Sequence, residues 1–256
     1  MNSQSVALVT GTSGSIRPGG ATASVGTLVV GRDAPDEVGA FSGRIWNHSN
    51  GKTQAITKTG TNTWILNRNG DLEYTGPTLV DGGTLQIGDE THATKLASSV
   101  VTVADGGTLV NFGTISKSVT IEDGGTYIGM KDSTAPGGIT FDDGSTLGFN
   151  LDSWGITVNT LDLTGSTFGD TTVYVSSEAD PSTLYGKSFD LFETSSANIL
   201  DKLTFASNLD GVLWTATYAN NLVTLSAANP GNVPEPATWL LLVMGLGGLV
   251  WFRRKK

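Results

Sequence analysis

Apolar and polar residues alternate in short segments along most of this chain, and the segments are separated by glycine-rich turns. Residues 101–109 read Val-Thr-Val-Ala-Asp-Gly-Gly-Thr-Leu, and residues 119–127 and 139–147 repeat this order of residue types. A looser copy occupies residues 77–85, and a decayed copy follows at 161–168. Alternation with a period of two is typical of strands that bury one face, and glycine readily adopts the positive φ of a sharp turn. The pattern therefore predicts an all-β fold of repeated strand–turn–strand units.

The turn aspartates of four copies define the length of this repeat. Asp81, Asp105, Asp123 and Asp143 are 24, 18 and 20 residues apart. A repeat of about 20 residues is too short for crossovers through helices, but it suits one coil of a parallel β-helix. Tight antiparallel hairpins are the alternative, because Asp-Gly also favours two-residue turns. We predict a right-handed parallel β-helix (a β-solenoid) over residues 1–175, regular from about residue 25.

Equivalent residues of successive coils would then form ladders along the solenoid. The predicted inward-facing residues are Leu85, Val103, Leu109, Ile121, Phe141 and Leu147. The predicted outward-facing threonines are Thr102, Thr120 and Thr140. Because only stacked neighbours can bury the inward face, such a fold needs several coils.

The repeat fades in residues 176–228, although short alternating segments continue there. Phe189–Phe192, Leu213–Tyr218 and Leu222–Leu225 still have the period of a strand. Terminal repeats of solenoids are usually atypical because they cover an open end. We therefore predict a β-rich capping segment over residues 176–228, with a separate small sandwich as the alternative.

The end of the chain has a different pattern. Residues 237–252 carry no charge, and they lie between Pro234-Glu235-Pro236 and a run of four cations, Arg253, Arg254, Lys255 and Lys256. Such a stretch predicts a transmembrane helix, although 16 residues is slightly below the usual length of about 18. The cations predict a cytoplasmic C-terminus. A buried core helix is the alternative.

These tail residues resemble the PEP-CTERM sorting signal, whose three parts occur here in order within residues 229–256. The resemblance implies that Pro234, Glu235 and Pro236 are recognised by an exosortase, a membrane-embedded transpeptidase-like enzyme of Gram-negative bacteria that make extracellular polysaccharide. It also implies that the helix at 237–252 holds the protein transiently in the inner membrane before processing. The basic residues 253–256 act as the cytoplasmic stop.

A second resemblance lies in residues 57–66 and 74–88. These segments are similar to the autotransporter-associated β-strand repeat, which combines Lys-Thr-Gly, a short apolar strand, Tyr-Thr-Gly-x-Thr and Gly-Gly-Thr-Leu. One full copy is clear, and Gly26–Gly31 looks like the end of an earlier copy. The resemblance implies strands of the predicted kind, and it does not imply self-translocation through an outer-membrane pore.

Composition excludes several classes of function. The net charge is −9, and the chain without its tail is still more acidic, which argues against binding DNA or RNA. The absence of cysteine excludes disulfides, thiol catalysis and thiolate metal sites. Residues 1–10 lack the basic and apolar regions of a secretory signal peptide, so we expect the sequence to be truncated or mis-started, or to be part of a longer protein.

An enzymatic role is the main alternative, because some parallel β-helices act on polysaccharides. Such sites need clustered carboxylates and usually a nearby cation. Between Asp71 and Asp201 the only cations are Lys95, Lys117, Lys131 and Lys187. We expect each turn aspartate to bond to its own backbone instead. We therefore predict no catalytic residues, no metal site and no cofactor.

The predicted function is that of a non-catalytic exported protein of the cell surface or extracellular matrix. The solenoid would be delivered by an exosortase and would act with extracellular polysaccharide. A polysaccharide-active β-helix enzyme or a glycan-binding adhesin is the alternative, since the threonine ladder could also bind sugar hydroxyls.

Overall fold

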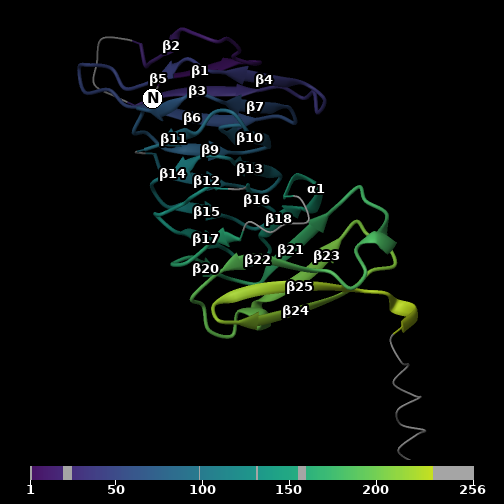
Figure 1. The fold of residues 1–256 in the computed structure, drawn as a ribbon. Helices are drawn as coiled ribbons and strands as arrows, with labels where there is room; N and C mark the ends of the chain where they lie inside the picture. The colour runs from purple at the N-terminus through teal and green to yellow at the C-terminus, as the bar shows by residue number, and fades with distance from the viewer. Residues whose placement is uncertain (1, 20–24, 98, 131, 155–159, 233–256) are drawn as a thin grey trace, which may run out of the picture.

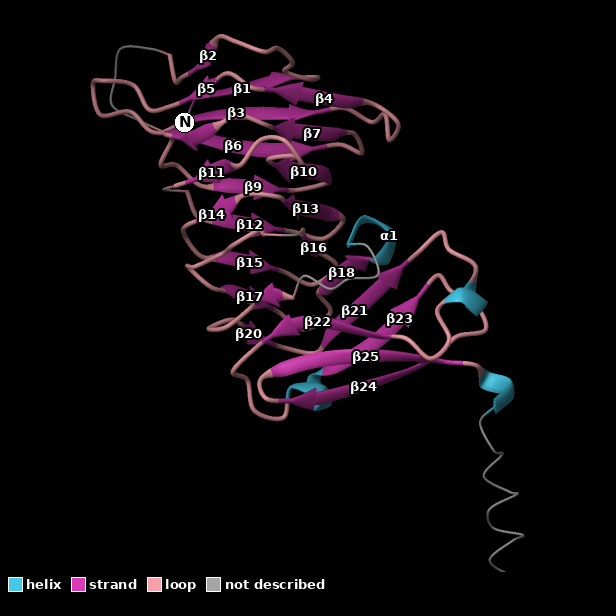
Figure 2. Cartoon of the chain, in the orientation of Figure 1, coloured by secondary structure: helices cyan, strands magenta, loops and turns pink. Residues whose placement is uncertain are grey.

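The computed structural model describes residues 2–19, 25–97, 99–130, 132–154 and 160–232. They form a parallel β-solenoid of right-handed type with about seven coils, which confirms the predicted β-solenoid. The coils stack along one axis from the N-terminal strands to the C-terminal strands (Figure 1). Strands account for most of the regular structure, and the helical segments are single short turns (Figure 2).

Two eight-stranded sheets form two sides of the solenoid, and neighbouring strands within each sheet are parallel. The first sheet contains β1 (Asn2–Val6), β3 (Gly26–Gly31), β6 (Gln54–Thr59), β9 (Thr78–Val80), β12 (Val101–Val103), β15 (Val119–Ile121), β17 (Ile139–Phe141) and β20 (Thr167–Phe168). The second contains β4 (Val38–Phe41), β7 (Thr63–Leu66), β10 (Gly83–Ile87), β13 (Gly107–Asn111), β16 (Thr126–Gly129), β18 (Thr146–Asn150), β21 (Thr171–Ser176) and β23 (Leu203–Ser207).

Shorter strands form the third side. They are β2 (Ser15–Ile16) paired with β5 (Arg44–Ile45), and the three-stranded sheet of β8 (Gly70–Leu72), β11 (Thr94–Leu96) and β14 (Thr114–Ile115). These pairs are also parallel. The helical turns are α1 (Leu151–Trp154) and the 3-10 turns Pro181–Thr183, Ile199–Lys202 and Pro230–Asn232.

The Asp-Gly-Gly segments are corners between two sheets rather than hairpin turns. β12 and β13 flank Asp105-Gly106-Gly107, yet each strand pairs in parallel with its equivalent in the next coil. The two glycines serve different purposes. Gly106 has a φ of +72°, which favours glycine, whereas a Cβ at Gly107 would collide with the Val80 carbonyl oxygen of the preceding coil. The hairpin alternative is therefore wrong.

The predicted ladders are present in register. Val103 pairs with Ile121, and Ile121 pairs with Phe141, while Leu85 pairs with Leu109 on the second sheet. All six predicted inward-facing residues are at most 1% exposed. The threonines at 102, 120 and 140 pair with one another on the outer face of the first sheet. Their alternation with buried residues confirms the period-two interpretation.

Residues 176–228 combine both kinds of strand pairing. β23 pairs in parallel with β21, and β22 (Ser188–Glu193) pairs in parallel with β19 (Leu161–Asp162). β22 also pairs antiparallel with β25 (Leu222–Ala228), which pairs antiparallel with β24 (Leu213–Ala219). These last strands lie across the C-terminal end of the solenoid (Figure 1). The domain boundary at residue 175 and the capping role stay predictions.

Stacked aromatic rings join the last coils to this segment. The rings of Phe141 and Phe168 are stacked with centroids 5.0 Å apart, and Phe168 stacks on Phe192 of β22 at 5.7 Å. Phe192 is fully buried. A bulge between Asp190 and Phe192 turns consecutive residues Leu191 and Phe192 into the interior, so one strand contributes two adjacent apolar side chains.

No helix among the described residues is long and apolar enough to cross a membrane. The predicted transmembrane helix at residues 237–252 lies outside the described residues.

Candidate functional site

The segment that resembles a strand repeat, residues 57–88, contains a lysine in an inward-facing row. Lys58 of β6 pairs with Val80 of β9, and Val80 pairs with Val103 of β12. The lysine therefore occupies the ladder position that an apolar side chain takes in the following coils. Its side chain is fully buried.

Backbone carbonyls at the corner of this coil hold the Lys58 ammonium group. Lys58 Nζ donates to Thr59 O at 2.6 Å, to Gly82 O at 3.2 Å and to Gly60 O at 3.4 Å. Burial lowers the pKa of Lys58 to about 8, because an apolar surrounding disfavours the charged form. The three carbonyls supply the hydrogen bonds that a buried cation requires. The lysine thus links two coils, and its burial keeps it from acting as a nucleophile on a substrate.

The glycines of the same segment are explained by close packing between coils. Gly60, the glycine of Lys-Thr-Gly, has a φ of +66°, and a Cβ there would lie 2.6 Å from the Arg32 backbone. Gly76, the glycine of Tyr-Thr-Gly-x-Thr, lies directly against the Gln54 backbone. These residue types are therefore required by the backbone path of the coil.

Tyr74 and Thr78 of the Tyr-Thr-Gly-x-Thr part of the repeat belong to a buried chain of hydrogen-bonded hydroxyl groups. Tyr74 and Thr78 are hydrogen-bonded at 2.6 Å, Thr78 and Ser99 at 2.8 Å, and Ser99 donates to Gly76 O at 2.8 Å. Burial raises the pKa of the Tyr74 phenol well above its usual value, so it stays neutral and serves as a hydrogen-bonding group. The Lys58 ammonium and the Tyr74 and Thr78 hydroxyls of the repeat thus face the interior and form a structural unit.

Asp105, Asp123 and Asp143 each lie two residues after register-paired strand ends, so they form a row along one corner. The Asp105 carboxylate lies against Gly124 of the next coil, and the Asp123 carboxylate lies against Gly144. Asp143 Oδ1 accepts a hydrogen bond from Asp170 N at 2.8 Å. The expectation that each turn aspartate bonds to its own backbone is therefore wrong for Asp143, whose carboxylate reaches the next coil. Within the described ranges, no group of His, Asp and Glu side chains has the arrangement of a metal site.

A histidine and an aspartate meet at a tight turn that sequence reasoning missed. His92 Nδ1 lies 2.8 Å from Asp89 Oδ1, and Asn67 donates to Asp89 Oδ2 at 2.9 Å. Burial raises the pKa of Asp89, but hydrogen bonds from Asn67, Thr91 and His92 outweigh it and hold this pKa well below its usual value. Asp89 and His92 are three residues apart in the sequence, but this spacing alone does not specify the contact.

This pair lies beside a hollow of about 470 Å³ that also contains Glu90, Phe112 and Met130. The Thr91 hydroxyl contacts both Asp89 Oδ1 and the same Nδ1 atom of His92. A Ser-His-Asp type of triad instead needs its hydroxyl on the opposite ring nitrogen. The arrangement is therefore that of a hydrogen-bonded turn, in which Thr91 N also donates to Asp89.

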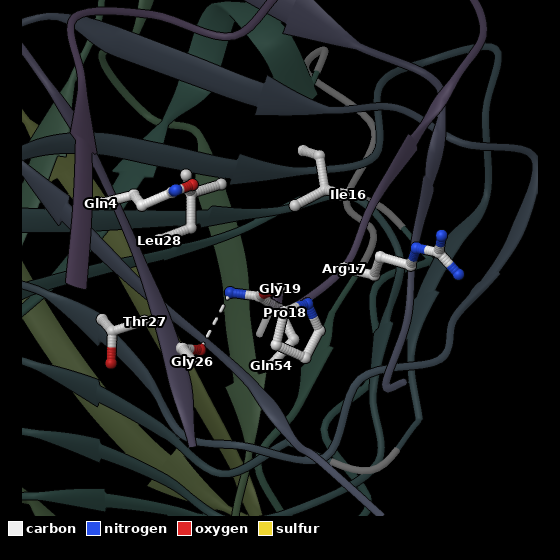
Figure 3. A pocket seen from close by; sticks show the side chains of 9 residues that line it. All are labelled: Gln4, Ile16, Arg17, Pro18, Gly19, Gly26, Thr27, Leu28 and Gln54. Atoms are coloured by element: carbon white, nitrogen blue, oxygen red, sulfur yellow. Dashed lines mark hydrogen bonds between the residues drawn. The ribbon is translucent and has the colours of Figure 1, made fainter. Parts of the chain in front are cut away.

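A smaller hollow of about 160 Å³ lies near the N-terminal end of the solenoid, between β1, β3 and the segment after β2 (Figure 3). Gln4 and Gln54 contribute amide groups, and Gln54 Nε2 donates to Gly26 O at 3.1 Å. Arg17 also lines the rim, but its side chain extends away from both glutamines (Figure 3). Apart from Arg17, the hollow is lined by neutral amides, backbone and apolar groups, and this lining provides no acid–base pair.

The predicted sorting residues Pro234, Glu235 and Pro236, and the basic residues 253–256, lie outside the described residues. The described chain reaches them from β25 through the 3-10 turn Pro230–Asn232. The signal is therefore attached directly after the antiparallel strands at the C-terminal end of the solenoid.

Comparisons with known families agree with both resemblances. Residues 232–256 match the PEP-CTERM protein-sorting motif, and residues 56–87 match the passenger-associated-transport-repeat. No curated protein matches the chain. The second match spans the coil that contains Lys58, Tyr74 and Thr78, whose roles are described above.

The fold defines the class of protein as a parallel β-solenoid, and residues 56–87 of this solenoid match the passenger-associated-transport-repeat. The chain carries a PEP-CTERM sorting signal at its C-terminal end, which implies recognition by an exosortase and an exported, cell-surface protein.

Proposed function

We propose that this chain is a non-catalytic structural protein of the cell surface or extracellular matrix, associated with extracellular polysaccharide. An exosortase recognises Pro234-Glu235-Pro236 while the apolar segment 237–252 holds the chain in the inner membrane, with Arg253–Lys256 on the cytoplasmic side. The solenoid then remains outside as the delivered part.

The observation that carries this proposal is the three-part order of the tail, in which the sorting motif, an apolar run and a basic cluster follow one another. Moving four cations across a bilayer is costly, so the helix stops with Pro-Glu-Pro at the outer edge. The repeat residues support a structural role, because Lys58 and Tyr74 are buried. Their polar groups form hydrogen bonds to Gly82 O and to the Thr78 hydroxyl inside the solenoid.

Mass spectrometry of the mature protein tests the sorting proposal. In a host with an exosortase, we expect a C-terminus near Pro236 and loss of residues 239–256. A matched variant with Glu235→Ala and an exosortase-deletion strain should both retain the unprocessed protein in the membrane fraction. Recovery of intact Lys256 on the released protein would contradict the proposal.

The alternative function, a polysaccharide-active enzyme or adhesin, predicts different behaviour of the purified protein. An enzyme would release sugar fragments from purified glycans, whereas the proposed structural protein would leave their length unchanged. Size analysis of glycans after long incubation separates these outcomes. Asp142 and Asp143 are adjacent carboxylates, and fragment release that persists in an Asp142→Asn/Asp143→Asn variant would place catalysis away from them.

A further inference from the structure

Charge is distributed unevenly along the solenoid. Residues 1–75 carry six basic and five acidic side chains, whereas residues 76–232 carry five basic and 18 acidic ones. The arginines among the described residues are Arg17, Arg32, Arg44 and Arg68, and they lie in the N-terminal part. An anionic partner would therefore meet the least repulsion on the N-terminal coils.

Three of these arginines gather on the third side of the solenoid. Trp46 pairs with Glu73 in parallel just after β5, so both residues lie on the same face in successive coils. The Arg44 guanidinium lies 4.5 Å from the centre of the Trp46 ring system, and that of Arg17 lies 5.5 Å from it. We call Arg17, Arg44, Trp46, Arg68 and Glu73 the arginine patch.

The patch is held in place by contacts among its own members. Arg44 Nε donates to Glu73 Oε1 at 2.9 Å, and Arg44 Nη2 donates to the other carboxylate oxygen, so the two side chains form a bidentate ion pair. Arg68 lies 3.9 Å from the same carboxylate. Aromatic contact and the fork of hydrogen bonds both restrict the guanidinium groups, so less entropy is lost when they bind a ligand.

Positive charge exceeds negative charge in this patch, because it has three guanidinium groups and one carboxylate, which pairs with Arg44 and Arg68. Within the described part of the chain, no carboxylate lies within ion-pair distance of Arg17, and Figure 3 shows its side chain extending away from the neighbouring glutamines. Arg17 is exposed, and Arg44 and Glu73 are each about 40% exposed. The patch can therefore offer unpaired N–H donors to an anion.

We propose that the arginine patch binds carboxylate groups of an anionic, uronate-containing polysaccharide. Guanidinium groups bind carboxylates through paired hydrogen bonds, and Arg17, Arg44 and Arg68 come from successive coils, which suits a chain ligand with repeated charges. This inference rests on the proposed association with extracellular polysaccharide and gives it a location. Acidic side chains over the remaining coils keep the polymer on the N-terminal part.

The test measures binding of the full-length protein, purified in detergent, to polygalacturonate and to the neutral polymer dextran. We expect binding to polygalacturonate that weakens as salt rises, and no binding to dextran. Arg17→Gln should reduce the affinity several-fold. Arg32→Gln is the matched control, because it removes an equal charge from an exposed arginine that pairs with Glu37 outside the patch.

Each other outcome has a distinct meaning. Equal loss in the two variants would overturn the patch as the site, since only overall charge would then matter. Binding to dextran without an effect of Arg17→Gln would retain an association with polysaccharide but overturn the anionic site. Binding to neither polymer would overturn both the site and the proposed association. Equally tight binding to duplex DNA would overturn the assignment to uronates.

Discussion

The regular coils and the C-terminal antiparallel strands bury apolar side chains in different ways. In the coils, each inward position stacks on an equivalent position, as Val103 does on Ile121. In β22, β24 and β25, packing combines neighbours that have no equivalents elsewhere, such as Phe189 with its edge-to-face partner Trp214. Inward positions of successive coils have similar surroundings, so similar residues recur there. Each buried position of β22, β24 and β25 has its own surroundings, so only the alternation of apolar and polar residues can be recognised in their sequence.

The two regions also end differently. The coils expose sheet edges wherever they stop, and edge strands invite pairing with other chains. At the C-terminal end, β22 adds antiparallel partners, and the aromatic stack of Phe168 and Phe192 joins it to the last coils. We therefore expect the antiparallel strands to contribute to the stability of the coils through this aromatic contact.

The largest effect should follow from removing the ring that joins the two regions. Phe192→Ala deletes a fully buried side chain that stacks on both Phe168 and Phe149, and we expect a loss of about 3–5 kcal/mol in the free energy of unfolding. Thermal or urea unfolding followed by circular dichroism measures it. Leu213→Ala on β24, at a residue that is 41% exposed, is the control and should cost much less. Equal effects of the two changes would contradict a shared core.

A pH dependence should distinguish the coil of Lys58 from the apolar coils that follow. The pKa of Lys58 falls from 10.5 to about 8 on folding, so the unfolded chain binds more protons between these values. Stability should therefore rise as the pH increases from about 8 to 10.5, by at most about 3.4 kcal/mol.

The measurement for Lys58 is the difference in unfolding free energy between the natural protein and Lys58→Met. This difference should change in favour of the natural protein over that pH range, because methionine cannot titrate. Comparing the two proteins cancels the titration of tyrosines and of other lysines. A difference that stays constant from pH 8 to 10.5 would show that the pKa of Lys58 is not lowered.

Substitutions at the corner Asp105-Gly106-Gly107 should show that stability there depends on the glycine backbone rather than on the charge of the aspartate. We expect Gly106→Val to destabilise by about 1–3 kcal/mol, because φ is +72° there. Gly107→Ala should also destabilise, because its Cβ would meet the Val80 carbonyl oxygen. Asp105→Asn should be nearly silent, since the side chain keeps its shape against Gly124. Chemical denaturation of the three variants checks this order, and a larger loss for the asparagine variant would reverse the interpretation.

The coils could be predicted from the sequence because each position of the repeat has similar surroundings in every coil. The Val103–Ile121–Phe141 ladder and the corner glycines follow from alternation and turn chemistry alone. Lys58 could not be assigned to the interior this way, because its burial depends on carbonyls from two coils that meet only in the fold.

Two other features were also beyond the sequence. The partners of β22 and β25 could not be derived, since alternation specifies a strand but neither its neighbour nor its direction. The contact between Asp89 and His92 depends on the turn that brings the two side chains together. The sorting signal, in contrast, was readable as a linear motif.

Cysteine cross-linking tests the parallel, in-register stacking of the coils most directly, because the chain has no native cysteine. Thr102 and Thr120 are register partners in adjacent coils, and neighbouring strands lie about 4.8 Å apart, within the reach of a disulfide. We predict rapid oxidation of Thr102→Cys/Thr120→Cys to an intramolecular disulfide. The control Thr102→Cys/Thr140→Cys, whose positions are two coils apart, should not cross-link. Equal cross-linking of the two pairs, or none in the first, would contradict the solenoid.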